Sequence, residues 1–237
     1  MTARRTWFSS AAAAMAAQCM MLGSLASAMP GAAQGKLRTH ADFRNETPSH
    51  DARKVADWVT TSGDNRGLPF VVIDKIAAKV FVFDLQGKIL GAAPALLGLG
   101  RGDNSVSGIG HRKLATIKPA ERTTPAGRFE ASLGNDFEQD LLWVDYDAAL
   151  SLHRVIVGSP ADHRHARLAS PTPLDNRITF GCINVPPGFY DTVVAPAFKG
   201  TVGIVYILPE TKPIGAVFAM RDEPATGVSV PVPMPTR

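Results

Sequence analysis

Between residues 49 and 60, apolar residues recur every three to four positions. This spacing predicts an amphipathic helix, with Ser49 or Asp51 as its N-cap. The apolar face of that helix comprises Ala52, Val55, Ala56 and Val59.

From Pro69 onward the apolar residues instead form short runs rich in β-branched and aromatic side chains, which are typical of strands. The predicted strands are residues 70–73, 80–83, 88–90, 141–144, 148–153 and 201–208. Residues 84–87 form a glycine-containing turn that indicates a hairpin, and Pro125 and Gly127 predict a tight turn into a further strand. A short helix is expected from Pro186 to Phe198. The predicted fold class is therefore mainly β with short helices.

The chain divides into four predicted parts. Residues 1–28 read as a signal peptide, because Arg4 and Arg5 precede a nearly uncharged run that ends in a small-residue cleavage pattern. Residues 29–66 form a flexible lead with one short helix, residues 67–210 the folded domain, and residues 211–237 a proline-rich tail expected to be disordered. The protein is thus expected in the periplasm or cell envelope. Retention of the leader as a membrane anchor and twin-arginine export are the alternatives.

Charge narrows the class of partner. The 237 residues contain 25 Lys and Arg against 21 Asp and Glu, and loss of the leader with Arg4 and Arg5 leaves 23 against 21, a net charge of +2. The basic residues are scattered along the sequence, so nothing predicts nucleic-acid binding. A long glycine-rich loop, residues 98–126, interrupts the strands, and such loops are usually functional or mobile.

Cys182 is the strongest candidate for chemistry, because the other cysteine, Cys19, lies in the leader. A lone cysteine in an oxidising compartment is either a small core residue or a reactive thiolate. Its neighbours favour the thiolate: Thr179 offers a hydroxyl, Gly181 permits a sharp turn, and Asn184 offers an amide.

A reactive thiol needs a base or cation nearby, and the chain has six histidines. His153 closes an apolar strand, which is a rigid platform for aiming a side chain, although a satisfied core histidine would look the same. The remaining histidines lie in predicted lead, loop or polar segments and are expected to be exposed or unspecified: His40, His50, His111, His163 and His165.

Four segments resemble, in order and rough spacing, the catalytic domain of the L,D-transpeptidase family, the YkuD-like fold: residues 71–83, Thr124–Phe129, His153 and Thr179–Asn184. The family signature is a histidine and, after a variable gap, Ser or Thr, one residue, Gly-Cys, an aliphatic residue and Asn or Arg. The resemblance covers about residues 67–210. It implies a mixed β-sandwich or barrel-like sheet.

The chain departs from the family pattern in two places. Phe180 stands where many members carry histidine, and His153 precedes Cys182 by 29 positions, a wide gap that an inserted run at residues 159–176 explains. His163 and His165 fit the usual spacing better, but they lie in that polar run, which looks like an exposed, mobile loop. The strand context therefore favours His153.

The resemblance implies two-step acyl transfer on peptidoglycan stem peptides, without metal or organic cofactor. Cys182 would attack the carbonyl of a meso-diaminopimelate centre, and His153 would carry the proton. Backbone amides around Gly181 and Cys182 would hold the oxyanion, while Thr179 and Asn184 shape the loop. An amine of a second stem peptide, a lipoprotein lysine, a free D-amino acid or water would take the acyl group. Three alternatives stay open: a carboxypeptidase or other hydrolase with the same site, a non-catalytic wall-binding module, and a metal site.

Overall fold

The computed structural model describes residues 40–136 and 139–220. The predicted signal peptide, residues 1–28, lies outside the described residues. Within them, no helix is long and apolar enough to cross a membrane.

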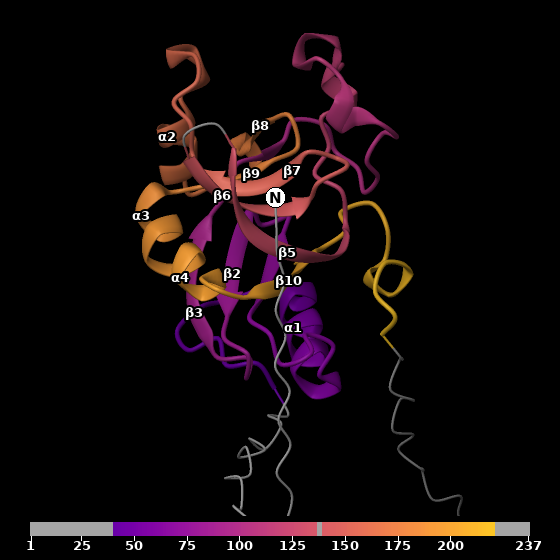
Figure 1. The fold of residues 1–237 in the computed structure, drawn as a ribbon, viewed down its shortest axis with the longest axis vertical. Helices are drawn as coiled ribbons and strands as arrows, with labels where there is room; N and C mark the ends of the chain where they lie inside the picture. The colour runs from indigo at the N-terminus through magenta and orange to yellow at the C-terminus, as the bar shows by residue number, and fades with distance from the viewer. Residues whose placement is uncertain (1–39, 137–138, 221–237) are drawn as a thin grey trace, which may run out of the picture. The chain divides into compact units, whose positions relative to one another are not determined.

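Eight strands form one mixed sheet, in the order β3-β2-β1-β10-β5-β6-β7-β9. Neighbours are antiparallel except for the parallel pairs β1–β10 and β7–β9. The strands are β1 (Phe70–Asp74), β2 (Lys79–Phe83), β3 (Ile89–Pro94), β5 (Gly127–Asp136), β6 (Gln139–Asp145), β7 (Leu150–Arg154), β9 (Ile183–Val185) and β10 (Val202–Ile207). A second, two-stranded parallel sheet pairs β4 (Leu97–Gly98) with β8 (Arg177–Thr179). The mainly β fold class is therefore confirmed, as a mixed, nearly closed sheet with few short helices (Figure 1).

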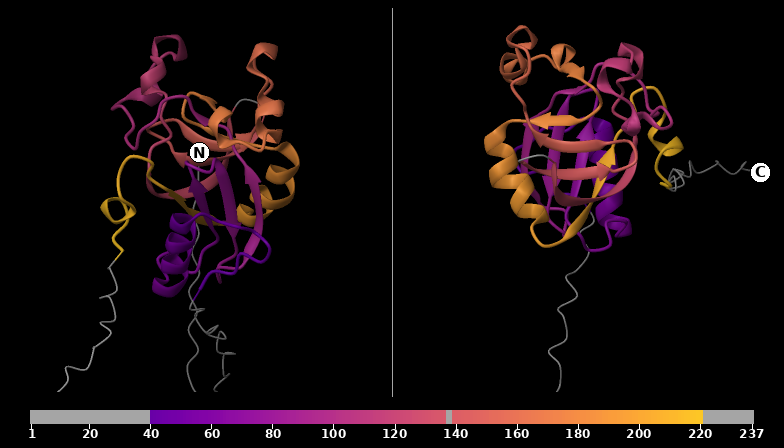
Figure 2. Two further views of the ribbon diagram at one scale, coloured as in Figure 1. Left: turned by 180° about the vertical axis from the view of Figure 1, so that it is seen from behind. Right: turned by 45° about the horizontal axis from the view of Figure 1, so that its top comes forward.

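Hydrophobic cores cover both faces of the sheet around β1 and β10, which explains their nearly unbroken apolar sequences. Val71 and Ile73 of β1 face one core, which the helical segment α3 (Pro187–Phe189), Tyr190–Val194 and α4 (Ala195–Phe198) closes. Phe70 and Val72 face the second core, beneath α1 (His50–Ser62). The views in Figure 2 show α1 and the α3–α4 segment against different faces of the sheet.

The predicted helix and hairpins are confirmed. Ser49 caps α1 by accepting a hydrogen bond from the Ala52 amide at 3.1 Å, and the predicted apolar face of the helix is buried. The strand predicted from Ala148 begins only at Leu150, because Ala149 adopts a φ of +50° in the preceding turn.

The predicted domain limits were too narrow at both ends. Phe43, placed in the flexible lead, is buried and packs edge-on against Phe81 and Phe83. Phe218, placed in the disordered tail, is buried beside Trp58. The packed domain thus includes residues 41–43 and 211–220, because the second core needs these side chains to cover its outer face. Residues 221–237 of the predicted tail lie outside the described residues.

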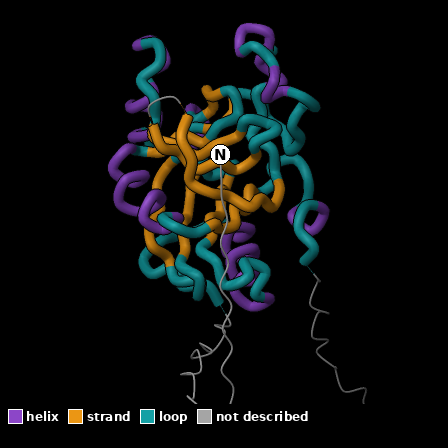
Figure 3. The backbone as a smooth tube through the Cα atoms, in the orientation of Figure 1, coloured by secondary structure: helices purple, strands orange, loops and turns teal. Residues whose placement is uncertain are grey.

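Segments of loop and short helix project beyond the strands at the upper end of Figure 3. Figures 1 and 2 show the 98–126 loop and the 159–176 insertion rising on opposite sides of this end. The loop contains short 3-10 helices at Ile109–His111, Leu114–Thr116 and Pro119–Glu121. The insertion contains α2 (Arg164–Ala169), with 3-10 turns at Pro160–Asp162 and Pro173–Asp175.

Candidate active site

Two neighbouring parallel strands place the candidate residues side by side. In the β7–β9 pair, His153 lies opposite Asn184. Because side chains alternate along a strand, Ser151 shares the sheet face of His153, and Cys182, just before β9, shares the face of Asn184. The alternate residues on these strands face the hydrophobic core. The pairing therefore brings Cys182, His153, Ser151 and Asn184 together on one side of the sheet.

The Cys182 thiol is half-buried and hydrogen-bonded. Its Sγ lies 3.5 Å from the Ser151 hydroxyl, which donates to it, and 3.5 Å from the Ala149 carbonyl, to which it donates. Burial raises the pKa of the thiol. The interactions with His153 and with the Ser151 hydroxyl and amide lower this pKa by more than burial raises it. The net result is a Cys182 pKa below its ordinary value.

The His153 ring is fixed at both nitrogens. Nδ1 lies 2.7 Å from the Arg154 carbonyl oxygen, so it carries the proton and donates it there. Nε2 lies 3.0 Å from Nδ2 of Asn184 and accepts from that amide. Transfer of a thiol proton to Nε2 therefore requires the Asn184 hydrogen bond to open.

Arg164 sets the orientation of the Asn184 amide. Its guanidinium, which can only donate, lies 3.1 Å from Oδ1 of Asn184, so Nδ2 must face His153. Asp162 in turn accepts from Arg164 at 3.0 Å. A chain of hydrogen bonds thus runs from the insertion to the His153 ring and selects its Nδ1-protonated tautomer.

The insertion is more ordered than its polar sequence indicated. Leu168 of α2 is buried and packs against Leu96, Val155 and partly buried Ile178. The exposure predicted for His163 and His165 is confirmed. The segment is not loop alone, however, because it contains α2 and is anchored by the buried Leu168. Arg164, which orients the Asn184 amide, was not singled out by the sequence analysis.

The turn before Cys182 needs glycine and is braced by two threonines. Gly181 has a φ of +138°, and a Cβ at this position would lie 2.9 Å from the Thr123 carbonyl oxygen. The Thr179 hydroxyl accepts from the Gly181 amide at 3.1 Å and donates to the Cys182 carbonyl at 2.7 Å. The Thr124 hydroxyl donates to the Gly181 carbonyl at 2.7 Å.

The two backbone amides that the sequence analysis expected to hold an oxyanion, those of Gly181 and Cys182, differ in their hydrogen bonding. The Gly181 amide already donates to Thr179. Across residues 40–136 and 139–220, the Cys182 amide donates no hydrogen bond to another group. Of the two, only the Cys182 amide is free to bind a developing negative charge.

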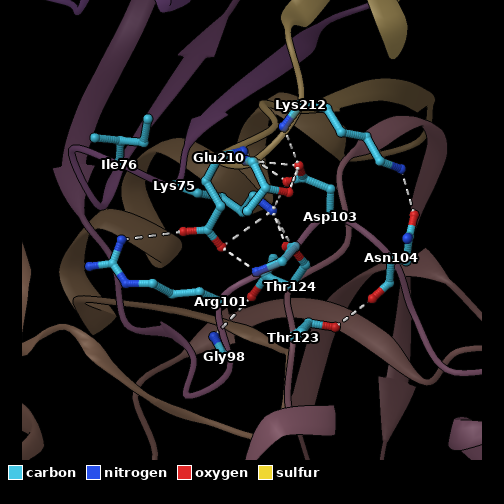
Figure 4. Close-up of polar contacts among 12 residues, drawn as sticks. Lys75, Ile76, Gly98, Arg101, Asp103, Asn104, Thr123, Thr124, Glu210 and Lys212 are labelled. Atoms are coloured by element: carbon cyan, nitrogen blue, oxygen red, sulfur yellow. Dashed lines mark hydrogen bonds and ion pairs between the residues drawn. The ribbon is translucent and has the colours of Figure 1, made fainter.

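A buried ionic cluster (Figure 4) is linked to the Cys182 turn through Thr124. Lys75, fully buried at the end of β1, donates to the Gly102 carbonyl at 2.6 Å, to Asp103 at 2.8 Å and to the Thr124 carbonyl at 2.9 Å. Glu210 lies 3.6 Å from the Lys75 ammonium and accepts from Arg177 of β8 at 2.6 Å. The cluster therefore ties the long loop and the C-terminal segment to the strand that leads into the Cys182 turn.

Burial and ion pairing oppose each other in this cluster. Burial lowers the pKa of Lys75, although Asp103 and Glu210 favour its charged form. Burial raises the pKa of Asp103, but hydrogen bonds from Lys75, Thr211 and the backbone hold it well below its usual range. Asp103 is thus an ionised acceptor for every donor around it.

The remaining histidines are exposed on other segments: His40, His50, His111, His163 and His165. In the described part of the chain, no group of three or more His, Cys, Asp or Glu side chains lies close enough together to hold a metal ion.

No protein-family model matches the chain, and no curated protein matches it. Among solved structures, similar ones include the helical cell shape determining protein Pgp2 from Campylobacter jejuni and a point mutant of it. The first match has 17% identity and a TM-score of 0.41, and covers 65% of this chain and 55% of Pgp2. The second has 16% identity and a TM-score of 0.39, and covers 70% and 58%. The chain thus spans little more than half the length of Pgp2, and a likeness this distant does not bear on function.

Proposed function

We propose that this protein is an exported cysteine acyltransferase of the L,D-transpeptidase type that acts on peptidoglycan stem peptides. The observation that carries the proposal is a half-buried thiol with a lowered pKa, placed by β7–β9 pairing beside His153 and Ser151. Lowered thiol pKa values next to a histidine are characteristic of cysteine nucleophiles. The motif resemblance supplies the substrate class, with the wall-facing periplasm or cell envelope as the compartment.

In the first half-reaction, Cys182 Sγ attacks the carbonyl carbon of a meso-diaminopimelate centre. The thiol proton passes to His153 Nε2 as the hydrogen bond from Asn184 opens. The Cys182 amide donates to the oxyanion of the tetrahedral intermediate. Collapse forms the thioester, breaks the bond to the terminal D-alanine, and returns the proton from His153 to the departing amine.

In the second half-reaction, an acceptor amine of another stem peptide or of a lipoprotein attacks the thioester. The amine loses its proton to His153, the C–S bond breaks as the new amide forms, and His153 returns the proton to the Cys182 thiolate. Water in place of the amine gives the L,D-carboxypeptidase reaction. Hydrolysis stays the second candidate activity because Cys182 is only half-buried.

Intact mass spectrometry with a carbapenem tests the proposal, since such drugs acylate the cysteine in the family this chain resembles. We expect one covalent adduct on the wild type and none on Cys182→Ala or on folded His153→Ala. His165→Ala, an exposed histidine of the insertion, is the matched control and should acylate normally. Normal acylation of His153→Ala, or no adduct on the wild type, would contradict the proposal.

A second experiment uses a meso-diaminopimelate tetrapeptide. Loss of D-alanine with a crosslinked dimer indicates transpeptidation, and loss with a tripeptide indicates hydrolysis. Binding without any loss of D-alanine would indicate a non-catalytic wall-binding module.

A further inference from the structure

Arg122 lies at the edge of the Cys182 turn. Its guanidinium carbon is 3.9 Å from the centre of the Phe180 ring, and Phe180 precedes Cys182 by two residues. The next residue, Thr123, presents its carbonyl to Gly181, at the close approach that only glycine permits. The long loop therefore delivers Arg122 to the same turn that carries the thiol.

Only one edge of this guanidinium is used. Nε and Nη2 both donate to the Ile117 carbonyl oxygen at 3.2 Å. In the described residues, no acceptor is hydrogen-bonded to Nη1 and no carboxylate forms an ion pair with Arg122. The Phe180 ring lies against the guanidinium and the Ile117 carbonyl holds its other edge, so the Nη1–Nη2 edge is a preorganised fork. Such a fork matches the two oxygens of a carboxylate.

The charges of the loop leave that fork unneutralised. Residues 98–126 contain five Lys and Arg but only two acids, Asp103 and Glu121. Asp103 is paired with Lys75 and Glu121 with Arg112. Both acids of the loop are thus already engaged, and a carboxylate from outside the chain would complete the Arg122 site.

We infer that Arg122 binds a substrate carboxylate that flanks the carbonyl attacked by Cys182. This inference rests on the proposed function for the identity of the substrate. A tetrapeptide stem offers such a carboxylate on its terminal D-alanine and another on the side chain of meso-diaminopimelate. Arg122 is then a specificity-determining residue, and Phe180 is the platform that orients it.

Alkylation of Cys182 by two reagents of similar size tests carboxylate binding without any peptidoglycan. Iodoacetate carries a carboxylate, whereas iodoacetamide carries a neutral amide. We expect Arg122→Gln to lower the iodoacetate-to-iodoacetamide rate ratio roughly tenfold, the factor that one charge-assisted hydrogen bond supplies. Any change in thiolate fraction affects both reagents and cancels in the ratio.

Lys113→Gln is the matched control, because it removes one positive charge from an exposed position of the same loop. Its ratio should stay within about twofold of the wild type, since an exposed charge is screened by salt. Arg122→Lys keeps the charge without the fork and should show an intermediate loss, which keeps the test available if Arg122→Gln does not fold. An unchanged ratio in the Arg122 variants, or an equal fall in Lys113→Gln, would overturn the inference.

Tetrapeptides amidated at one carboxylate identify the group that is bound. Amidation of the recognised carboxylate should raise KM for the wild type and leave Arg122→Gln unaffected, whereas amidation of the other should affect both equally. If the alkylation ratio behaves as expected but no peptide loses D-alanine, the carboxylate site stands and the proposed acyl transfer fails. If peptides turn over but the ratio is insensitive to Arg122, the inference fails and the proposed function stands.

Discussion

Replacing Lys75 with methionine should destabilise the protein more than any surface charge change. Its ammonium is fully buried and donates to three acceptors, Asp103 and the Gly102 and Thr124 carbonyls. Removing one partner of a buried ion pair costs about 3–5 kcal/mol. That is a large part of the about 5–15 kcal/mol that stabilises a whole domain.

The remaining contacts decide where in this range the cost falls. Without Lys75, the Asp103 carboxylate still accepts from the amides of Glu210, Thr211 and Lys212 and from the Thr211 hydroxyl. The two carbonyls, by contrast, lose a buried donor, at about 1–3 kcal/mol for each group left unsatisfied. Because the carboxylate remains solvated by the protein while the carbonyls do not, we expect a loss of about 3 kcal/mol for Lys75→Met.

Urea unfolding at neutral pH measures this loss as a lower midpoint with an unchanged m-value. Lys79→Met is the matched control, since its ion pair with Glu46 is partly exposed at 2.6 Å and should be worth about 0.2–1 kcal/mol. In Lys75→Met, Cys182 should also be alkylated more slowly, because Thr124 links the cluster to Gly181. A loss below about 1 kcal/mol for Lys75→Met would show that water or backbone shifts replace the ammonium, and would refute the reasoning.

Three further predictions concern the site and its support. The alkylation rate of Cys182 should rise with pH, with a midpoint below the free-thiol pKa of about 8.5. His153→Ala and Ser151→Ala should each move that midpoint to higher pH, and a midpoint that neither variant moves would contradict the assigned contacts. In Arg164→Met, the Asn184 amide is free to turn while the Arg154 carbonyl still holds the proton on Nδ1. 15N NMR should therefore show a shifted His153 Nε2 resonance in an unchanged Nδ1-protonated tautomer, and an unchanged Nε2 resonance would exclude the positioning role. The folded-state pKa of Asp103 lies below its unfolded value of about 3.9. The ionised Asp103 therefore stabilises the fold above that pH, and this stabilisation is lost as the pH falls below it. Asp103→Asn should flatten this part of a stability–pH profile measured by urea unfolding.

Periodicity predicted the elements whose side chains alternate or recur over several turns. The apolar face of α1 and the runs of β1, β2 and β10 fall in this class, because each buries its pattern against one of the two cores. The strands that frame Cys182 are different. β8 and β9 have three residues each, too few to show a period, and they form because β4 and β7 lie beside them.

The residues of the candidate site likewise divide into those that local sequence patterns indicate and those that only tertiary pairing brings into place. Cys182 and His153 were selected from local signals, a lone thiol in a glycine turn and a histidine in a strand. Ser151 and Arg164 were missed because their importance comes from pairing. The spacing of Ser151 to His153, two residues along one strand, was the available signal for Ser151. Nothing in the sequence of the insertion indicates that Arg164 reaches Asn184, twenty positions further along the chain.

The hydrogen bond between Asn184 and His153 sets an energetic condition on the proposed acyl transfer. Opening one neutral hydrogen bond costs about 0.5–1.5 kcal/mol, which slows a reaction by roughly tenfold at most. General base catalysis supplies about 10²–10⁴-fold, so the resting contact is small beside the benefit of a positioned base. Turning the amide instead would break the bond from Arg164, a charge-assisted contact worth about 1.5–3 kcal/mol. In the proposed acyl transfer, the imidazole, whose other nitrogen donates to the Arg154 carbonyl, is therefore the group that would move toward Cys182.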